Sequence, residues 1–84
     1  MTTLLSVTVK YFGGFREAGD EAVLVLEKGA ALNDIKKALS VYLEEKFDGL
    51  IAVSALTDHE KILSEEFTVE TSCELGILPP VCGG

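Results

Sequence analysis

The segment Leu78-Pro79-Pro80-Val81-Cys82-Gly83-Gly84 holds the residues that could take part in chemistry. The two prolines fix φ and favour extended backbone, so we expect this segment to leave the domain as a stiff, directed tail. Gly83 and Gly84 lack a Cβ, so they can thread a narrow channel and expose the terminal carboxylate to another protein's active site. A carboxylate is a poor electrophile, and its chemistry would begin with activation, most simply by ATP as an adenylate on a partner enzyme.

The two cysteines and the single histidine indicate no second reactive centre. Cys73, Cys82 and His59 offer too few ligands for zinc or an iron–sulfur cluster, and a structural disulfide is not expected in a reducing cytosol. Cys82 is either another small side chain or an exposed thiol that reacts close to the activated carbonyl. We expect Cys73 to be a buried strand residue and His59 a solvated turn residue. No phosphate-binding, dinucleotide-binding or nucleophile-elbow motif is present.

The composition of the chain is that of one small globular domain. Its 84 residues are 48% hydrophobic and 25% charged, with a net charge of −7 that disfavours nucleic acid as a partner. No apolar run approaches the roughly 20 residues of a membrane span, and the start lacks the basic residues of a signal peptide, so we expect a cytoplasmic protein. Residues 57–84 contain six acidic side chains and one lysine, a net −5. This excess fits either a basic partner surface or solubility alone.

The first half of the chain predicts a hairpin followed by a helix. Residues 4–12 alternate apolar and polar side chains, Gly13-Gly14 breaks the pattern, and after a polar loop at 15–20 a second apolar run covers 22–28. From 32 to 47 the period becomes helical, and the expected inward face comprises Leu32, Ile35, Ala38, Leu39, Tyr42 and Leu43. Asn33 or a neighbour would cap the start, and Asp48-Gly49 would end the helix.

The second half predicts further strands. Residues 50–56 read as a third strand, 57–61 as a turn, 62–63 as a brief strand and 74–78 as the last strand, which Pro79 ends because it cannot donate to a sheet ladder. The prediction is an α+β fold, a mixed sheet with one main helix packed across one face. The domain would cover 1–78, with 79–84 as the extended tail. This order of elements is that of the ubiquitin-like β-grasp.

With its terminal Pro-Pro-Val-Cys-Gly-Gly, the chain resembles the small subunit of molybdopterin synthase and, more loosely, the thiamine-pathway sulfur carrier and ubiquitin. The resemblance spans the chain in element order, is sharp in the tail, and has minor support from residues 10–12 and 15–17. The chain departs from the family pattern at Leu78, where an aromatic residue is usual, at 53–55 and at 71–74.

The resemblance implies a role and partners for this chain. Gly84 would be adenylated by a ubiquitin-activating-type enzyme that uses ATP, and a sulfur donor, a persulfide protein, would convert it to a thiocarboxylate. The segment Leu78, Pro79, Pro80, Val81, Cys82 and Gly83 would line the passage into the large subunit, within a heterotetramer. The chain would then be a non-catalytic, sulfur-donating subunit with no permanently bound cofactor or metal.

Three alternatives remain open at this point. A carrier for thiamine, cysteine or tRNA thiolation would need the same tail, and so would a ubiquitin-like modifier joined through Gly84 to other proteins. A plain β-grasp binding module, in which the Gly-Gly end is incidental, is the third reading, because such a fold does not by itself define a function.

Overall fold

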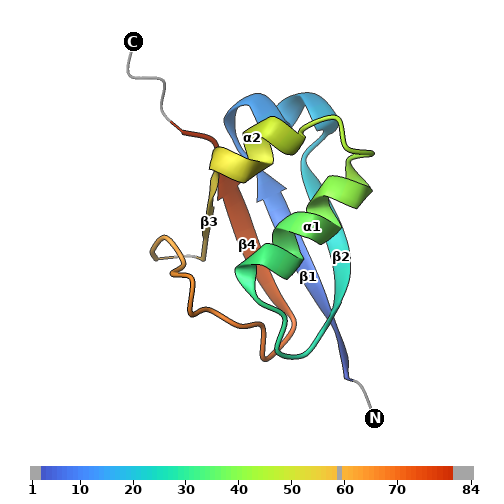
Figure 1. Ribbon diagram of the computed structural model, residues 1–84, viewed down its shortest axis with the longest axis vertical. Coiled ribbons are helices and arrows are strands. Elements are labelled where there is room, and N and C mark those ends of the chain that lie inside the picture. The colour runs from blue at the N-terminus through green and yellow to red at the C-terminus, as the bar shows by residue number, and fades with distance from the viewer. Residues whose placement is uncertain (1–2, 59, 81–84) are drawn as a thin grey trace.

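The computed structural model describes residues 3–58 and 60–80, which form a mixed sheet with helices on one face (Figure 1). In chain order the elements are β1 (Leu4–Tyr11), the 3-10 helix η1 (Gly13–Ala18), β2 (Glu21–Glu27), α1 (Leu32–Tyr42), α2 (Asp48–Val53), β3 (Ala55–Thr57) and β4 (Cys73–Leu78). The strand order is β2-β1-β4-β3, with β1 parallel to β4 and the other two pairs antiparallel. The predicted α+β class and mixed sheet are confirmed.

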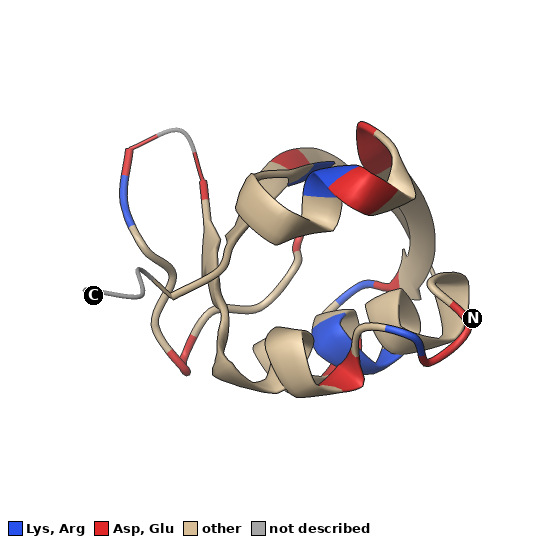
Figure 2. Ribbon diagram, turned by 90° about the horizontal axis from the view of Figure 1, so that it is seen from above, with Lys and Arg blue, Asp and Glu red and all other residues tan. Residues whose placement is uncertain are grey.

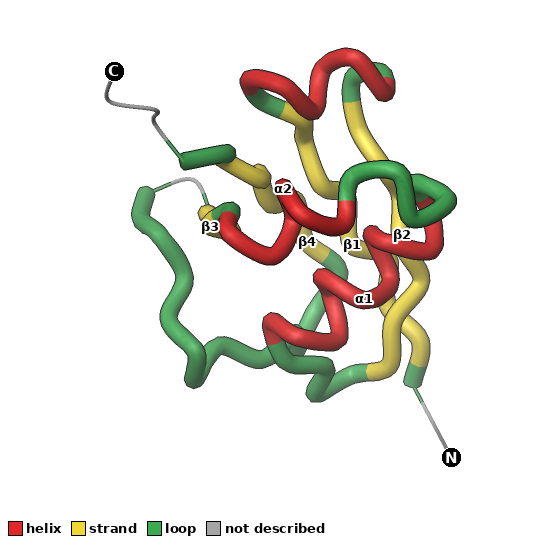
Figure 3. Tube along the Cα trace, turned by 45° about the horizontal axis from the view of Figure 1, so that its top comes forward, coloured by secondary structure: helices red, strands yellow, loops and turns green. Residues whose placement is uncertain are grey.

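The core lies between the sheet and α1, on the side where Figure 3 shows the helices. Alternate residues of the strands and the inner stripe of α1 are buried there, among them Val7, Val9, Tyr11, Ala22, Leu24, Ile35, Leu39, Leu75 and Ile77. This pattern follows from the two-residue period of strands and the 3.6-residue period of helices. The opposite face of the sheet is left open.

Helix α1 is shorter than the sequence predicts. It ends at Tyr42 rather than Phe47, because Glu44 and Glu45 adopt positive φ values of 56° and 64°, which a helix cannot accommodate. Ala31 precedes its first turn, and its N–H donates to Asp34 Oδ2 at 2.9 Å, so Asp34 rather than Asn33 closes the start. Tyr42, expected on the inner face, is half-exposed.

The predicted third strand at 50–56 is wrong in its first part. Helix α2 begins at Asp48, where the sequence predicts a helix end, and the strand is confined to Ala55–Thr57. Within α2, Leu50 and Ile51 face inward while Ala52 and Val53 are exposed. Two adjacent inward residues fit a helical turn and not a strand, whose side chains alternate between faces.

Two further segments differ from the sequence prediction. Residues 15–20 are predicted as a polar loop, but η1 covers most of them and turns Phe15 fully into the core. The centroid of the Phe15 ring lies 6.4 Å from that of Tyr11 and 5.8 Å from that of Phe47. The brief strand at 62–63 is a single antiparallel bridge between Ile62 and Thr57. The last strand is confirmed, and it begins one residue early, at Cys73.

Candidate functional site at the base of the C-terminal tail

The C-terminal tail starts from one of the two central strands of the sheet. Strand β4 pairs with β1 on one side, as in Tyr11↔Ile77, and with β3 on the other, as in Ala55↔Leu78. Leu75 and Ile77 point into the core, and β4 ends at Leu78, directly before the prolines. A strand paired on both sides and anchored in the core gives the tail a fixed starting point.

Pro79 rests on the turn that follows β1. A Cβ built on Gly13 would lie 2.6 Å from Pro79 Cγ and 3.3 Å from Pro79 Cδ, so the proline ring lies against the bare α-carbon of that glycine. Gly13 also has φ +57°, a conformation that L side chains rarely adopt. The turn and the start of the tail are therefore in direct contact.

Phe12 covers β4 on the open face of the sheet. A Cβ on Gly76 would meet Phe12 Cε2 at 2.7 Å and Thr57 Oγ1 at 3.1 Å, so the ring and the hydroxyl close over a strand position that has no side chain. Phe12 is 43% exposed and Leu78, the next outward-facing residue of β4, is 37% exposed. Apolar surface thus lies beside the start of the tail on the open face.

Charged groups border this apolar surface. A shallow hollow of about 90 Å³ is lined by Lys10, Phe12, Thr57, Asp58, Glu74, Leu75 and Gly76. Lys10 Nζ lies 2.6 Å from Glu21 Oε1, and that hydrogen bond raises the lysine pKa, with smaller contributions from Glu74 and Asp20. Figure 2 shows further acidic residues in the loop that follows β3, where Asp58 Oδ1 accepts the N–H groups of Glu60 and Lys61.

Of the site residues predicted from the sequence, the structure describes those up to Pro80. Leu78 is the last residue of β4, Pro79 is half-buried on Gly13, and Pro80 is exposed. Val81, Cys82, Gly83 and Gly84 lie outside the described residues, as does His59. The structure thus describes the base of the predicted tail, and the roles of these residues stay predictions.

The rest of the described chain offers little other chemistry. Cys73 is an unpaired, half-buried thiol whose pKa is raised by burial, which favours the unreactive protonated form. Residues 3–58 and 60–80 contain no cluster of three or more potential metal-ligating His, Cys, Asp or Glu side chains. No helix within that part of the chain is long and apolar enough to cross a membrane.

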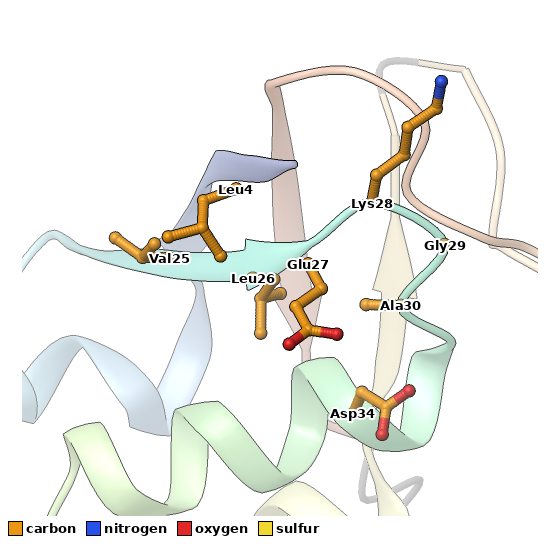
Figure 4. A pocket seen from close by; sticks show the side chains of 8 residues that line it. All are labelled: Leu4, Val25, Leu26, Glu27, Lys28, Gly29, Ala30 and Asp34. Carbon is orange, nitrogen blue, oxygen red and sulfur yellow. The ribbon is translucent and has the colours of Figure 1, made fainter. Parts of the chain in front are cut away.

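A larger pocket, of about 550 Å³, lies at the opposite end of the sheet (Figure 4). Apolar side chains of Leu4, Val25 and Leu26 border it, Glu27 and Asp34 extend into the space between β2 and α1, and Lys28 points away. Asp34 is already bonded to the backbone at the start of α1. This pocket is remote from the tail and shares no residue with its base.

Sequence reasoning missed the residues that support the tail. It treats Gly13 only as a turn signal, and it assigns no role to Phe12 or Gly76. A glycine inside a strand pattern does signal a close approach of other atoms, so Gly76 could have been singled out. The contact between Gly13 and Pro79 could not have been predicted, because nothing in the local sequence connects these two residues.

Comparison with known proteins found no matching family model and no matching curated protein, whereas several solved structures are similar to this chain. SAMP1 from Haloferax volcanii has a TM-score of 0.77 at 17% identity, covering 94% of this chain and 99% of its own. A protein described as molybdopterin converting factor, subunit 1, from Pyrococcus furiosus has a TM-score of 0.75 at 25% identity, covering 92% and 99%. The ubiquitin of Caldiarchaeum subterraneum has a TM-score of 0.66 at 15% identity, covering 98% and 100%.

These likenesses extend over nearly the whole of each chain. The chain therefore has the ubiquitin-like β-grasp fold that the order of its elements predicts.

Proposed function

We propose that this β-grasp chain is a sulfur carrier whose working group is the terminal carboxylate of Gly84. The observation that carries the proposal is the Pro-Pro tail ending in Gly-Gly, which leaves the doubly paired strand β4 beside exposed apolar surface. The likeness to the molybdopterin converting factor subunit supports it, at 25% identity over 92% of this chain.

The chain would supply the reacting group while its partners supply catalysis. A carboxylate oxygen of Gly84 attacks the α-phosphorus of ATP, pyrophosphate leaves, and an acyl adenylate forms. The terminal sulfur of a persulfide donor then attacks the acyl carbon and displaces AMP, which yields an acyl disulfide. A second thiol then attacks the donor's sulfur in this acyl disulfide, forms a new disulfide with the donor, and releases the thiocarboxylate on Gly84.

The open face of the sheet would dock the partners. Phe12 and Leu78 supply apolar area beside the tail, and Glu74 and Asp58 lie at the margin of the same surface. Apolar centres with charged rims are typical of protein interfaces. The activating enzyme is therefore expected to present a basic, partly apolar surface to this face.

Within the sulfur carriers, we assign the chain to molybdopterin synthesis, as the small subunit of a heterotetrameric synthase. Pro79-Pro80-Val81 and the Pyrococcus furiosus neighbour support this assignment. In that role Leu78, Pro79, Pro80, Val81, Cys82 and Gly83 would occupy the passage into the large subunit, and the thiocarboxylate would give its sulfur to the pterin precursor.

Reconstitution tests the proposal in two stages. The first measures ATP–pyrophosphate exchange by the activating enzyme of the source organism with the full chain, a variant lacking Gly84, and Gly29→Ala as a matched control at the other end of the sheet. Exchange should require Gly84 and tolerate Gly29→Ala. The second stage adds the sulfur donor, the large subunit and the pterin precursor, and it should yield molybdopterin.

Each failure has a separate meaning. Exchange that persists without Gly84 would contradict the carrier role. Normal thiocarboxylate formation without molybdopterin would instead place the carrier in another pathway. A ladder of conjugated proteins, in place of sulfur transfer, would identify a modifier.

A further inference from the structure

We propose that Gly13 is a positioning residue that sets the direction in which the tail leaves the domain. The inference rests on the proposed function and deepens it, since it concerns how the same carboxylate is presented to the activating enzyme. The observation is the seating of the Pro79 ring on Gly13, where a Cβ would lie 2.6 Å from Pro79 Cγ.

The turn that carries Gly13 is itself firmly anchored. Phe15, two residues further on, is fully buried between the rings of Tyr11 and Phe47. A Cβ on the neighbouring Gly14 would be in ordinary contact with Leu50 Cδ2, at 3.5 Å, so η1 also lies against α2. The turn therefore cannot easily retreat from a side chain added at position 13.

The other side of the contact is equally constrained. Pro79 follows directly from β4, whose Ile77 is fully buried and pairs with both Tyr11 and Leu56. Since neither the turn nor the strand can give way, a methyl group at position 13 must displace the proline ring. Pro79 is where the tail begins, so this displacement changes the direction of everything that follows it.

Two other glycines provide controls for backbone strain. Gly29 and Gly19 also have positive φ, +93° and +132°, but a Cβ on either would meet nothing within 4 Å. Alanine at these positions introduces an unfavourable φ without touching the tail. Pro80, exposed and adjacent to Pro79, is the matching control for loss of a proline ring.

The kinetic test measures kcat and KM for adenylation of the full chain by the activating enzyme of the source organism. We expect Gly13→Ala to lower kcat/KM by about tenfold or more, because misplacement of a reacting group by about 1 Å can cost that much. Gly29→Ala should stay near wild type. Gly13→Ala combined with Pro79→Ala should be no worse than Pro79→Ala alone, because the clash is gone.

Two results would overturn the proposal. One is a Gly13→Ala variant with wild-type kcat/KM. The other is a loss from Gly13→Ala that persists in full on top of Pro79→Ala, since it would show that the glycine acts through something other than the proline ring. If Gly13→Ala does not fold, a comparison of kcat/KM between Pro79→Ala and Pro80→Ala still tests the proposal. Equal activities of those two variants would contradict a special role for the Pro79 contact.

A structural measurement separates this inference from the proposed function. A nitroxide spin label attached to Cys82, in a Cys73→Ser background, broadens the amide NMR signals of the residues that the tail approaches. The set of broadened amides should change in Gly13→Ala and be unchanged in Gly29→Ala. That result would support positioning even if the wild-type chain were never adenylated, and an unchanged set in Gly13→Ala would refute it.

Discussion

Tyr11 places a phenol hydroxyl inside the core. Only 3% of the residue is exposed, and the hydroxyl has no hydrogen-bond partner among the described residues. A buried hydroxyl without a partner costs about 1–3 kcal/mol, so we expect Tyr11→Phe to keep or raise the free energy of unfolding, by up to about 1 kcal/mol. Urea denaturation measures this, with Tyr11→Ala as the control that should lose about 3–5 kcal/mol. A loss above 1 kcal/mol in Tyr11→Phe would mean that the hydroxyl is bonded.

The same residue makes stability depend on alkaline pH. Burial, and to a smaller extent Tyr42, raises the pKa of Tyr11 above its usual 10.0. The folded state therefore favours the protonated phenol, so its contribution is complete below the unfolded pKa and is lost as the pH rises through the folded pKa. The advantage of Tyr11→Phe over wild type should grow above about pH 10. Parallel stability curves for the two proteins from pH 8 to pH 11 would argue against this coupling.

At the scale of elements, β4 is built around a position that only glycine fills without rearrangement. Gly76→Ala must move the Phe12 ring, which is partly exposed and can swing aside, so we expect a loss of about 1 kcal/mol rather than unfolding. In a Phe12→Ala background most of this loss should disappear, because the obstructing ring is gone. Urea denaturation of the wild type, the two single variants and the double variant measures the coupling. Equal losses in both backgrounds would show that Thr57, not Phe12, sets the limit.

Periodicity predicted the strands of the hairpin and, apart from Tyr42, the inner face of α1, because each presents one face to a single core. It failed at 50–53, the first part of the predicted third strand, where a run of apolar residues has no period that separates strand from helix. It also failed at Phe15, which follows two glycines and resembles a loop residue until η1 turns it between Tyr11 and Phe47. Pro79 was identified as a strand end, but its seat on Gly13 is a tertiary contact that no local pattern contains.

At the scale of the whole molecule, the effect of the net charge of −7 on partner binding should depend on where the acidic residues lie. Glu74 borders the hollow beside Phe12, whereas Glu27 lies at the opposite end of the sheet by the larger pocket. We expect Glu74→Lys to raise the KM for the activating enzyme about threefold to tenfold at low salt, and the effect to shrink as salt screens it. Glu27→Lys changes the net charge equally and should have little effect. Equal effects of the two variants would mean that only the total charge matters for binding, and not the position of Glu74 beside Phe12.

The most direct test of the account is the intact mass of the chain after incubation with the activating enzyme, ATP, a persulfide donor and a reducing thiol. Exchange of one oxygen for sulfur at Gly84 predicts a gain of about 16 Da, absent from a variant lacking Gly84 and retained in Gly29→Ala. An unchanged mass under conditions in which the enzyme forms the adenylate would contradict the sulfur-carrier role.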